Sequence, residues 1–192
     1  HALVRRLIKN FAVNLDDQHA FFDFLVQSHE ATSDSKARME MAARLVSQAW
    51  KRGKGQTQYR SGFLAREVEL AEMRGLPYDP SDETVVAPVR GYLKHLVFRH
   101  VLTEHFPSLQ LGQLYLMMVY GLVRWYARAL AQGAGAAAVA APHVREAIRV
   151  VETNYVFSSK LHQRLMTESH LKKDVERLLA DKLTPYRLVR TV

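Results

Sequence analysis

Residues 109–132 read LQLGQLYLMMVYGLVRWYARALAQ, and this stretch decides the fold. On a helical wheel of 100° per residue, four polar side chains fall within an arc of about 60°. These four are Gln110, Gln113, Arg124 and Arg128. Almost all of the remaining circumference is apolar or small, and such a helix has to be surrounded by other elements. The sequence therefore predicts a central helix at about 109–132 with one narrow polar seam.

Helical periodicity continues on both sides of this segment, and no convincing alternation of apolar and polar residues appears. The predicted helices cover residues 2–13, 18–28, 33–52, 59–74, 81–105, 109–132, 142–155 and 167–183. The pattern predicts an all-α fold, a single-domain bundle of about seven to eight helices over residues 1–192. An N-terminal helical subregion 1–75 beside a C-terminal bundle 81–183 is the alternative division.

Local signals set several of these boundaries. Gly75 is expected to end the helix at 59–74, since glycine accepts the left-handed conformation that closes a helix. Ser81 or Asp82 is expected to cap the next helix. That helix has an alternative start at Pro88, because an interior proline removes one backbone donor. Pro142 suits the first turn of the following helix, after a linker of small residues at 133–141.

Composition excludes several classes of function. The chain has no cysteine, which excludes disulfides, thiolate metal sites and iron–sulfur clusters held by its own residues. Its net charge of +8 favours acidic partners or nucleic acid, although a solvated arginine-rich surface explains the same charge. The first residue is His1, which suggests a processed chain or a fragment. No secretory signal or transmembrane run is visible, so a cytoplasmic location is expected.

No catalytic, cofactor-binding or metal-binding residue is predicted. His95, His100 and His105 recur every five residues and do not share a helical face. Glu69 and Glu72 have no partner motif and are read as part of a salt-bridged surface. Nucleotide-binding loops and hydrolase motifs are absent from the sequence.

Two groups of residues remain as candidates for binding. One is the polar seam Gln110, Gln113, Arg124 and Arg128 on the central helix. The other is a basic patch of Lys51, Arg52, Lys54 and Arg60. Because Tyr59 lies beside the patch, it offers the charge and stacking that bind single-stranded nucleic acid. A ligand pocket between the helices, as in helical regulators, is a further alternative.

One stretch resembles a known family. It begins with Tyr92-Leu93 and Phe106-Pro107, continues through Tyr115-Leu116 to Arg124-Trp125, and ends with Val144 to Tyr155. The order of these motifs, over about residues 91–165, resembles the C-terminal helical region of bacterial flagellin lysine-N-methylases and related cysteine-cluster proteins. That family holds an iron–sulfur cluster on N-terminal cysteines. Since this sequence has none, the resemblance implies a detached, non-catalytic helical part or a relative that has lost the chemistry, and no functional residue is carried over.

The sequence thus leads to two functional expectations. The first is a non-catalytic helical scaffold or interaction domain without a cofactor, whose partner is another protein or another domain of a longer chain. The alternative is a basic helical domain that binds nucleic acid or responds to a ligand.

Overall fold

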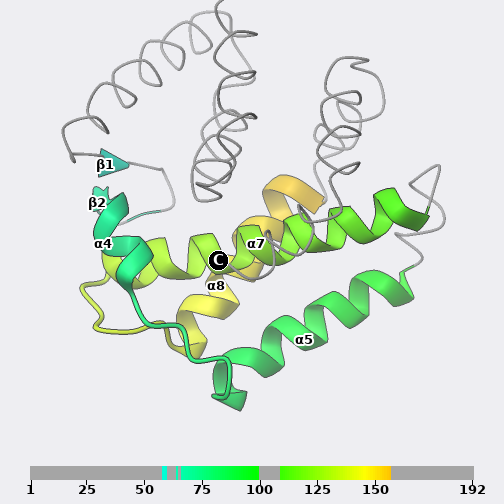
Figure 1. Cartoon of the computed structure of the whole chain (residues 1–192), viewed down its shortest axis with the longest axis horizontal. Coiled ribbons are helices and arrows are strands. Elements are labelled where there is room, and N and C mark those ends of the chain that lie inside the picture. Colours follow the sequence, from blue (N-terminus) through cyan, green and yellow to red (C-terminus); the bar gives the residue numbers. More distant parts are fainter. Residues whose placement is uncertain (1–57, 60–63, 65, 100–108, 157–192) are drawn as a thin grey trace, which may run out of the picture.

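The computed structural model describes residues 58–59, 64, 66–99 and 109–156, and this part of the chain is mostly helical. Its elements, drawn in Figure 1, are β1 (Gln58–Tyr59), β2 (Val68–Glu69), α4 (Leu70–Gly75), α5 (Glu83–Phe98), α7 (Leu109–Gly133), α8 (Ala141–Val151) and the π-helical turn η1 (Glu152–Val156). None of the described helices has the length and apolar character needed to cross a membrane.

Several predictions lie outside the described residues. These are the helices at 2–13, 18–28, 33–52 and 167–183, and the basic patch Lys51, Arg52, Lys54 and Arg60. The predicted bundle of seven to eight helices is therefore represented here by α4, α5, α7 and α8.

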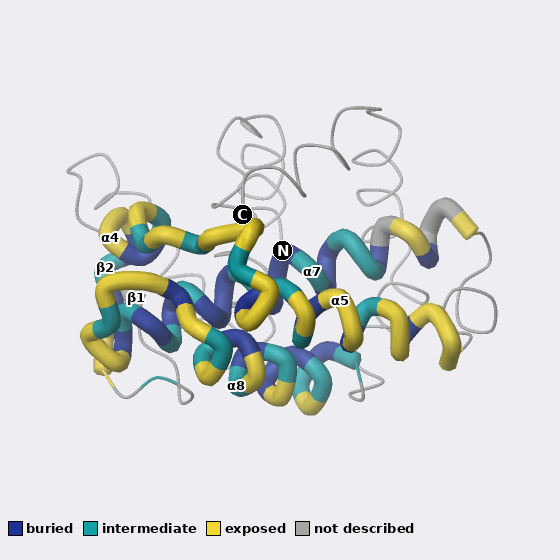
Figure 2. Tube along the Cα trace, turned by 90° about the horizontal axis from the view of Figure 1, so that it is seen from below, coloured by how far each residue is buried: buried dark blue, intermediate teal, exposed yellow. Residues whose placement is uncertain are grey.

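Helix α7 is the centre of the described structure, as its sequence predicts. It spans 25 residues and packs against α4, α5 and α8. Figure 2 shows buried positions along most of its length. The largest side chains of its middle part are fully enclosed, with Leu122 and Tyr126 at 0% exposure. Leu114 and Leu122 both belong to the apolar part of the helical wheel, which predicts that they are buried; burial is confirmed for Leu122, whereas the side chain of Leu114 lies outside the description.

The C-terminal half of α7 contributes both small and aromatic residues to the core. Ala127, Ala129 and Ala131 are all fully buried, and side chains this short let a neighbouring element approach closely. Just before them in the sequence, the ring of Tyr126 meets that of Trp125 edge to face, with centroids 5.1 Å apart. The Tyr126 hydroxyl also lies 3.0 Å from the hydroxyl of Tyr155 in η1. This buried hydrogen bond pairs the polar atoms of two side chains that lie within the aromatic core.

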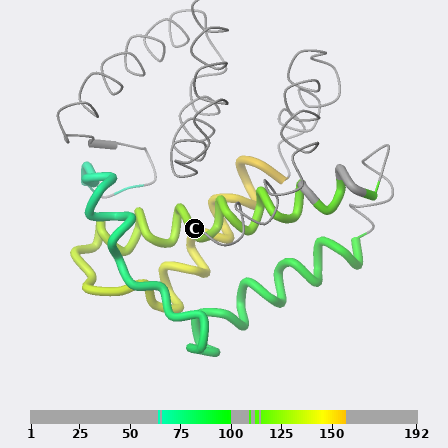
Figure 3. Tube along the Cα trace, viewed as in Figure 1, coloured from blue at the N-terminus to red at the C-terminus, as the bar shows by residue number. Residues whose placement is uncertain are grey.

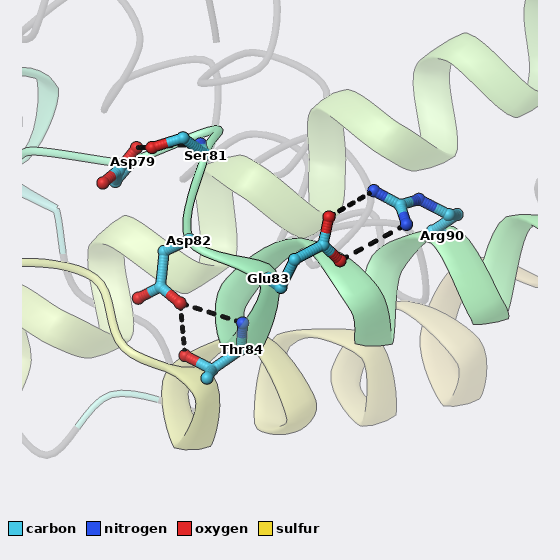
Figure 4. A network of polar contacts seen from close by, with 6 residues as sticks. All are labelled: Asp79, Ser81, Asp82, Glu83, Thr84 and Arg90. Carbon is cyan, nitrogen blue, oxygen red and sulfur yellow. Dashed lines mark hydrogen bonds and ion pairs between the residues drawn. The ribbon is translucent and has the colours of Figure 1, made fainter.

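Helix α5 begins at its cap and not at its proline. The carboxylate of Asp82 accepts hydrogen bonds from the backbone N–H and the hydroxyl of Thr84, at 2.8 and 2.7 Å (Figure 4). Pro88 lies inside the helix, so the alternative start there is wrong. Glu83 and Arg90, which lie on either side of Pro88 in the sequence, form an ion pair. The cap at Asp82 and this ion pair both stabilise the first turns of α5.

The C-terminal end of the predicted helix at 81–105 is described only in part. Helix α5 extends to Phe98, and residues 100–105 lie outside the described residues. Val97 and Phe98 are 43% and 78% exposed. The last turn of α5 therefore lacks the burial that stabilises the rest of the helix.

The predicted helix at 59–74 is wrong at the described residues that precede Leu70. Gln58 and Tyr59 instead pair antiparallel with Glu69 and Val68, and Leu70–Gly75 is helical, while residues 60–63 and 65 lie outside the described residues. Val68 and Leu70 are each 1% exposed. These buried side chains are two residues apart, which is the spacing of an extended segment. Burial on the core thus overrides the helical propensity of this stretch.

The connection after α7 brings two loops together. Gly135 has a φ of +71° and closes α7, with the N–H of Gly135 bonded to Gln132 O and the N–H of Ala136 bonded to Ala131 O. Further on, the N–H of Val139 donates to the carbonyl of Pro77. Figure 3 traces both connections past the same end of α7. Helix α8 then begins with Pro142 in its first turn, as predicted.

Candidate binding site of paired arginines

One stripe of α7 keeps part of its surface accessible. Most of the accessible positions follow one another at three or four residues, the spacing of one helical face. The described positions of α7 that are not fully buried are Leu109, Gln113, Leu116, Met117, Tyr120, Arg124, Arg128, Leu130 and Gln132. Three members of the predicted seam, Gln113, Arg124 and Arg128, lie on this stripe. The side chain of Gln110 lies outside the description.

The two arginines of the seam meet at one tyrosine. The guanidinium carbon of Arg124 lies 4.5 Å from the centroid of the Tyr78 ring, and that of Arg128 lies 5.8 Å from it. Arg124 also lies over Tyr120, at 5.4 Å, and its Nη1 donates to the Tyr120 hydroxyl at 3.3 Å. We call these four residues the paired-arginine site. Gln113 is exposed on the same stripe but has no contact with the site among the described interactions.

Tyr78 is held in place by the connection between α4 and α5. The Nε of Arg128 donates to the carbonyl of Leu76 at 3.3 Å, which fastens this connection to α7. Asp79 accepts hydrogen bonds from the N–H and the hydroxyl of Ser81, and these bonds lower the pKa of the Asp79 carboxyl. The turn is therefore ordered on both sides of Tyr78.

Burial and like charge shape the electrostatics of the site. Burial, and next the neighbouring Arg124, lower the pKa of Arg128 to about 10. Burial also raises the pKa of Tyr78, so this phenol stays neutral at physiological pH. In the part of the chain that the structure describes, no carboxylate pairs with Arg128. The site thus concentrates positive charge in partly buried surroundings.

Hydrogen-bond donors of Arg128 remain available at this site. A guanidinium has five N–H bonds, and the only described hydrogen bond of Arg128 uses its Nε. One turn further along α7, the carboxylate of Glu72 accepts a hydrogen bond from Gln132 at 2.9 Å. The terminal nitrogens of Arg128 can therefore donate to an incoming anion.

A second polar cluster was missed by the sequence analysis. Glu152, which lies within the predicted helix at 142–155, accepts hydrogen bonds from the Tyr92 hydroxyl and from Nη1 of Arg99. Burial and this contact raise the pKa of Tyr92, and the pKa of the buried Tyr115 is raised by burial and by Glu152. No signal in the sequence marks the change from α-helix to π-helix at Glu152 that positions its side chain. The cluster fastens α5 to the end of α8.

The described residues contain no group of three or more histidine, aspartate or glutamate side chains placed to hold a metal ion. His95 is exposed, and His143 accepts a hydrogen bond from the N–H of Ala140 at the start of α8. His100 and His105 lie outside the described residues.

Comparisons with family models, curated proteins and solved structures gave no match for this chain. The resemblance to the C-terminal region of flagellin lysine-N-methylases therefore stays a prediction.

Proposed function

We propose that this chain is a non-catalytic helical interaction domain that binds a negatively charged segment of a partner protein. The paired-arginine site is the observation that carries the proposal. It places two guanidiniums on the accessible stripe of the central helix, with both carbons within 5.8 Å of the centroid of one tyrosine ring.

The placement of Arg124 and Arg128 on one helical face lowers the stability of the folded chain. Like charges four residues apart on a helix destabilise it by about 0.2–0.5 kcal/mol, and burial adds to this cost, as the lowered pKa of Arg128 reflects. The cation–π contacts with Tyr78 offset part of it. An aromatic ring provides no negative charge, however, so an anionic partner would stabilise Arg128 further. Groups with perturbed pKa values of this kind are more frequent at functional sites.

The test is a binding titration with two peptides of equal length. One consists of glutamate and aspartate, and the other of glutamine and asparagine. The acidic peptide should raise the melting temperature of the protein, because a ligand that binds the native state stabilises it. Arg124→Gln combined with Arg128→Gln should weaken this binding by at least about tenfold, since hydrogen bonds to charged groups contribute about 1.5–3 kcal/mol each.

The chain offers a matched control. Arg90 and Arg149 are exposed arginines that pair with Glu83 and Glu146. Replacing both by glutamine removes the same formal charge away from the site, and the acidic peptide should bind this variant nearly as well as the original protein. An equal loss in both double variants would mean that net charge alone drives binding. A single-stranded oligonucleotide that outcompetes the acidic peptide would favour the nucleic-acid alternative.

The same proposal includes the wider architecture expected from the sequence. In it, the full chain forms one bundle of seven to eight helices around α7 and meets its protein partner in the cytoplasm. The burial of α7 supports the bundle, because its enclosed side chains between Tyr115 and Ala131 need neighbouring elements around them.

A further inference from the structure

We propose that the start of α8 is a pH-sensitive switch, in which protonation of His143 in mild acid releases the N–H of Ala140 and loosens the connection from α7. This connection is residues 134–140, between Gly133 at the end of α7 and Ala141 at the start of α8. None of these residues belongs to the paired-arginine site, so the switch does not depend on the proposed function. It follows from the hydrogen bond that His143 accepts, the charge of the first turn of α8, and the contacts of the connection.

An imidazole caps the first turn of α8. The N–H of Ala140 donates to Nδ1 of His143 at 3.1 Å, and the N–H of His143 donates back to the carbonyl of Ala140 at 3.0 Å. Ala140 is the N-cap residue and has no polar side chain with which to cap the helix itself. His143 is the third residue of the helix, the position that Glu or Gln occupies in a capping box. Unlike those residues, histidine changes its charge between about pH 5 and 8.

Protonation of His143 is unfavourable at this position for two reasons. Nδ1 accepts a hydrogen bond only while the ring is neutral and its single proton is on Nε2, whereas both nitrogens of an imidazolium are donors. Uptake of a proton therefore breaks the hydrogen bond from Ala140. It also places a positive charge at the N-terminus of a helix, where the helix dipole disfavours cations. The first turn of α8 has no acidic residue to offset that charge.

Among the described residues, no carboxylate forms an ion pair with His143. Burial lowers the pKa of His143, and no charged side chain is among the causes of this shift. The acidic residues on and near the elements that pack against α8 are engaged with other partners, namely Asp79 with Ser81, Asp82 with Thr84, Glu83 with Arg90, Glu146 with Arg149 and Glu152 with Arg99. The remaining charged or histidine side chains of α5, α7 and α8 are basic, namely Lys94, His95, Arg124, Arg128 and Arg145.

The connection also holds the loop between α4 and α5. Val139 is 6% exposed, and its N–H donates to the carbonyl of Pro77 at 3.0 Å. Both connections pass the same end of α7 (Figure 3). Val139 and Ala140 are consecutive, and each donates one described backbone hydrogen bond that fixes the connection. Release of Ala140 therefore removes one of these two bonds and lets the bond between Val139 and Pro77 open more often.

The direction of the pH effect follows from the two states of the chain. The unfolded chain takes up the proton near the ordinary histidine pKa of about 6.5. The folded protein takes it up at lower pH, because its His143 pKa is lowered. Between the two values the unfolded chain holds more protons, so stability falls as the pH falls. The contribution of the cap is thus fully present above about pH 6.5 and is lost below it.

NMR of the full chain between about pH 7.5 and 5 tests the switch, since this range covers the titration of histidine. The Cε1–H of the His143 ring reports its protonation, and the amide protons of Ala140 and Val139 report the two hydrogen bonds. Both amide shifts should change with the same midpoint as the ring. Protection of the Val139 amide from hydrogen exchange, corrected for the intrinsic effect of pH, should fall by about fivefold, the usual effect of a lost cap.

The chain contains its own control. The N–H of Thr84 is capped by the carboxylate of Asp82 at the start of α5, and not by an imidazole. Its shift should show no step at the His143 midpoint. This comparison of Ala140 with Thr84 needs no substitution, so the switch can be tested even if a variant fails to fold.

Variants assign the response to one side chain. His143→Gln keeps an acceptor that can cap the helix but does not titrate, so the pH response of Ala140 should disappear. His143→Ala should show reduced protection of Val139 throughout the pH range. His95→Gln removes an exposed histidine of α5 and should leave the response unchanged. Circular dichroism establishes that each variant is folded.

Three results would overturn the inference. One is a midpoint for Ala140 that differs from that of the His143 ring. Another is a pH step at Ala140 that persists in His143→Gln. The third is a response of Ala140 without one at Val139, because the connection would then stay fixed when the cap is lost.

Discussion

Leu122→Ala tests whether α7 is the centre of the fold. The Leu122 side chain has 0% exposure and belongs to the main hydrophobic core. The substitution removes three carbon atoms, and at about 0.8 kcal/mol per buried methylene the lost transfer free energy is about 2.4 kcal/mol. The cavity left behind adds to this, because a packed helix relaxes only in part. The free energy of unfolding should therefore fall by about 2–5 kcal/mol.

The same helix provides the control. Leu109 is 57% exposed at the start of α7, so Leu109→Ala makes the same chemical change where little surface is buried. That variant should lose less than about 1 kcal/mol. Urea denaturation followed by circular dichroism at 222 nm measures both values, and an unchanged slope with denaturant shows that the same cooperative unit unfolds.

The outcome decides between two descriptions of α7. A loss at Leu122 several times that at Leu109 agrees with a central, enclosed helix. A loss below about 1 kcal/mol at Leu122, or losses of equal size at the two positions, would refute the burial on which the fold depends.

Two further predictions concern the chain reversal after α7 and the cluster at Glu152. Gly135→Ala should lower the free energy of unfolding by about 1–2 kcal/mol in urea denaturation, because the φ of +71° is strained for any residue with a Cβ; no change would argue against the left-handed closure. Tyr92→Phe should cost about 1–3 kcal/mol, since Glu152 loses a hydrogen bond in partly buried surroundings. Burial and Glu152 raise the pKa of Tyr92, so above about pH 10 the unfolded chain loses this proton while the folded protein keeps it. Stability should therefore fall as the pH rises beyond that point, and the fall should be smaller in Tyr92→Phe; identical pH profiles would contradict the role of Tyr92.

Much of the described fold follows from local sequence signals. The bounds of α7 were predicted to within one residue. A helix that is apolar on nearly all sides must be surrounded by other elements to bury its side chains, so its apolar pattern is recognisable in the sequence. The cap at Asp82 and the proline at the start of α8 were also correct. These signals act within a few residues of the chain, so they can be recognised without knowing what packs against them.

Only part of the candidate site could be predicted from the sequence. The helical wheel placed Arg124 and Arg128 on one face, because that depends on helix geometry alone. It did not reveal Tyr78, which comes from the connection between α4 and α5 and reaches the arginines only in the folded chain. The wheel also could not show the burial that lowers the pKa of Arg128.

By itself, then, the sequence determined the central helix, its polar seam and the starts of α5 and α8, since short-range chemistry governs each of them. The tertiary structure decided three other features: the pairing of Gln58–Tyr59 with Val68–Glu69, the inward turn of Glu152, and the meeting of both arginines at Tyr78. Each of these joins residues that are distant in sequence or depends on a change of helical pitch. The energy of such a contact depends on what the folded core places beside it, which no local pattern records.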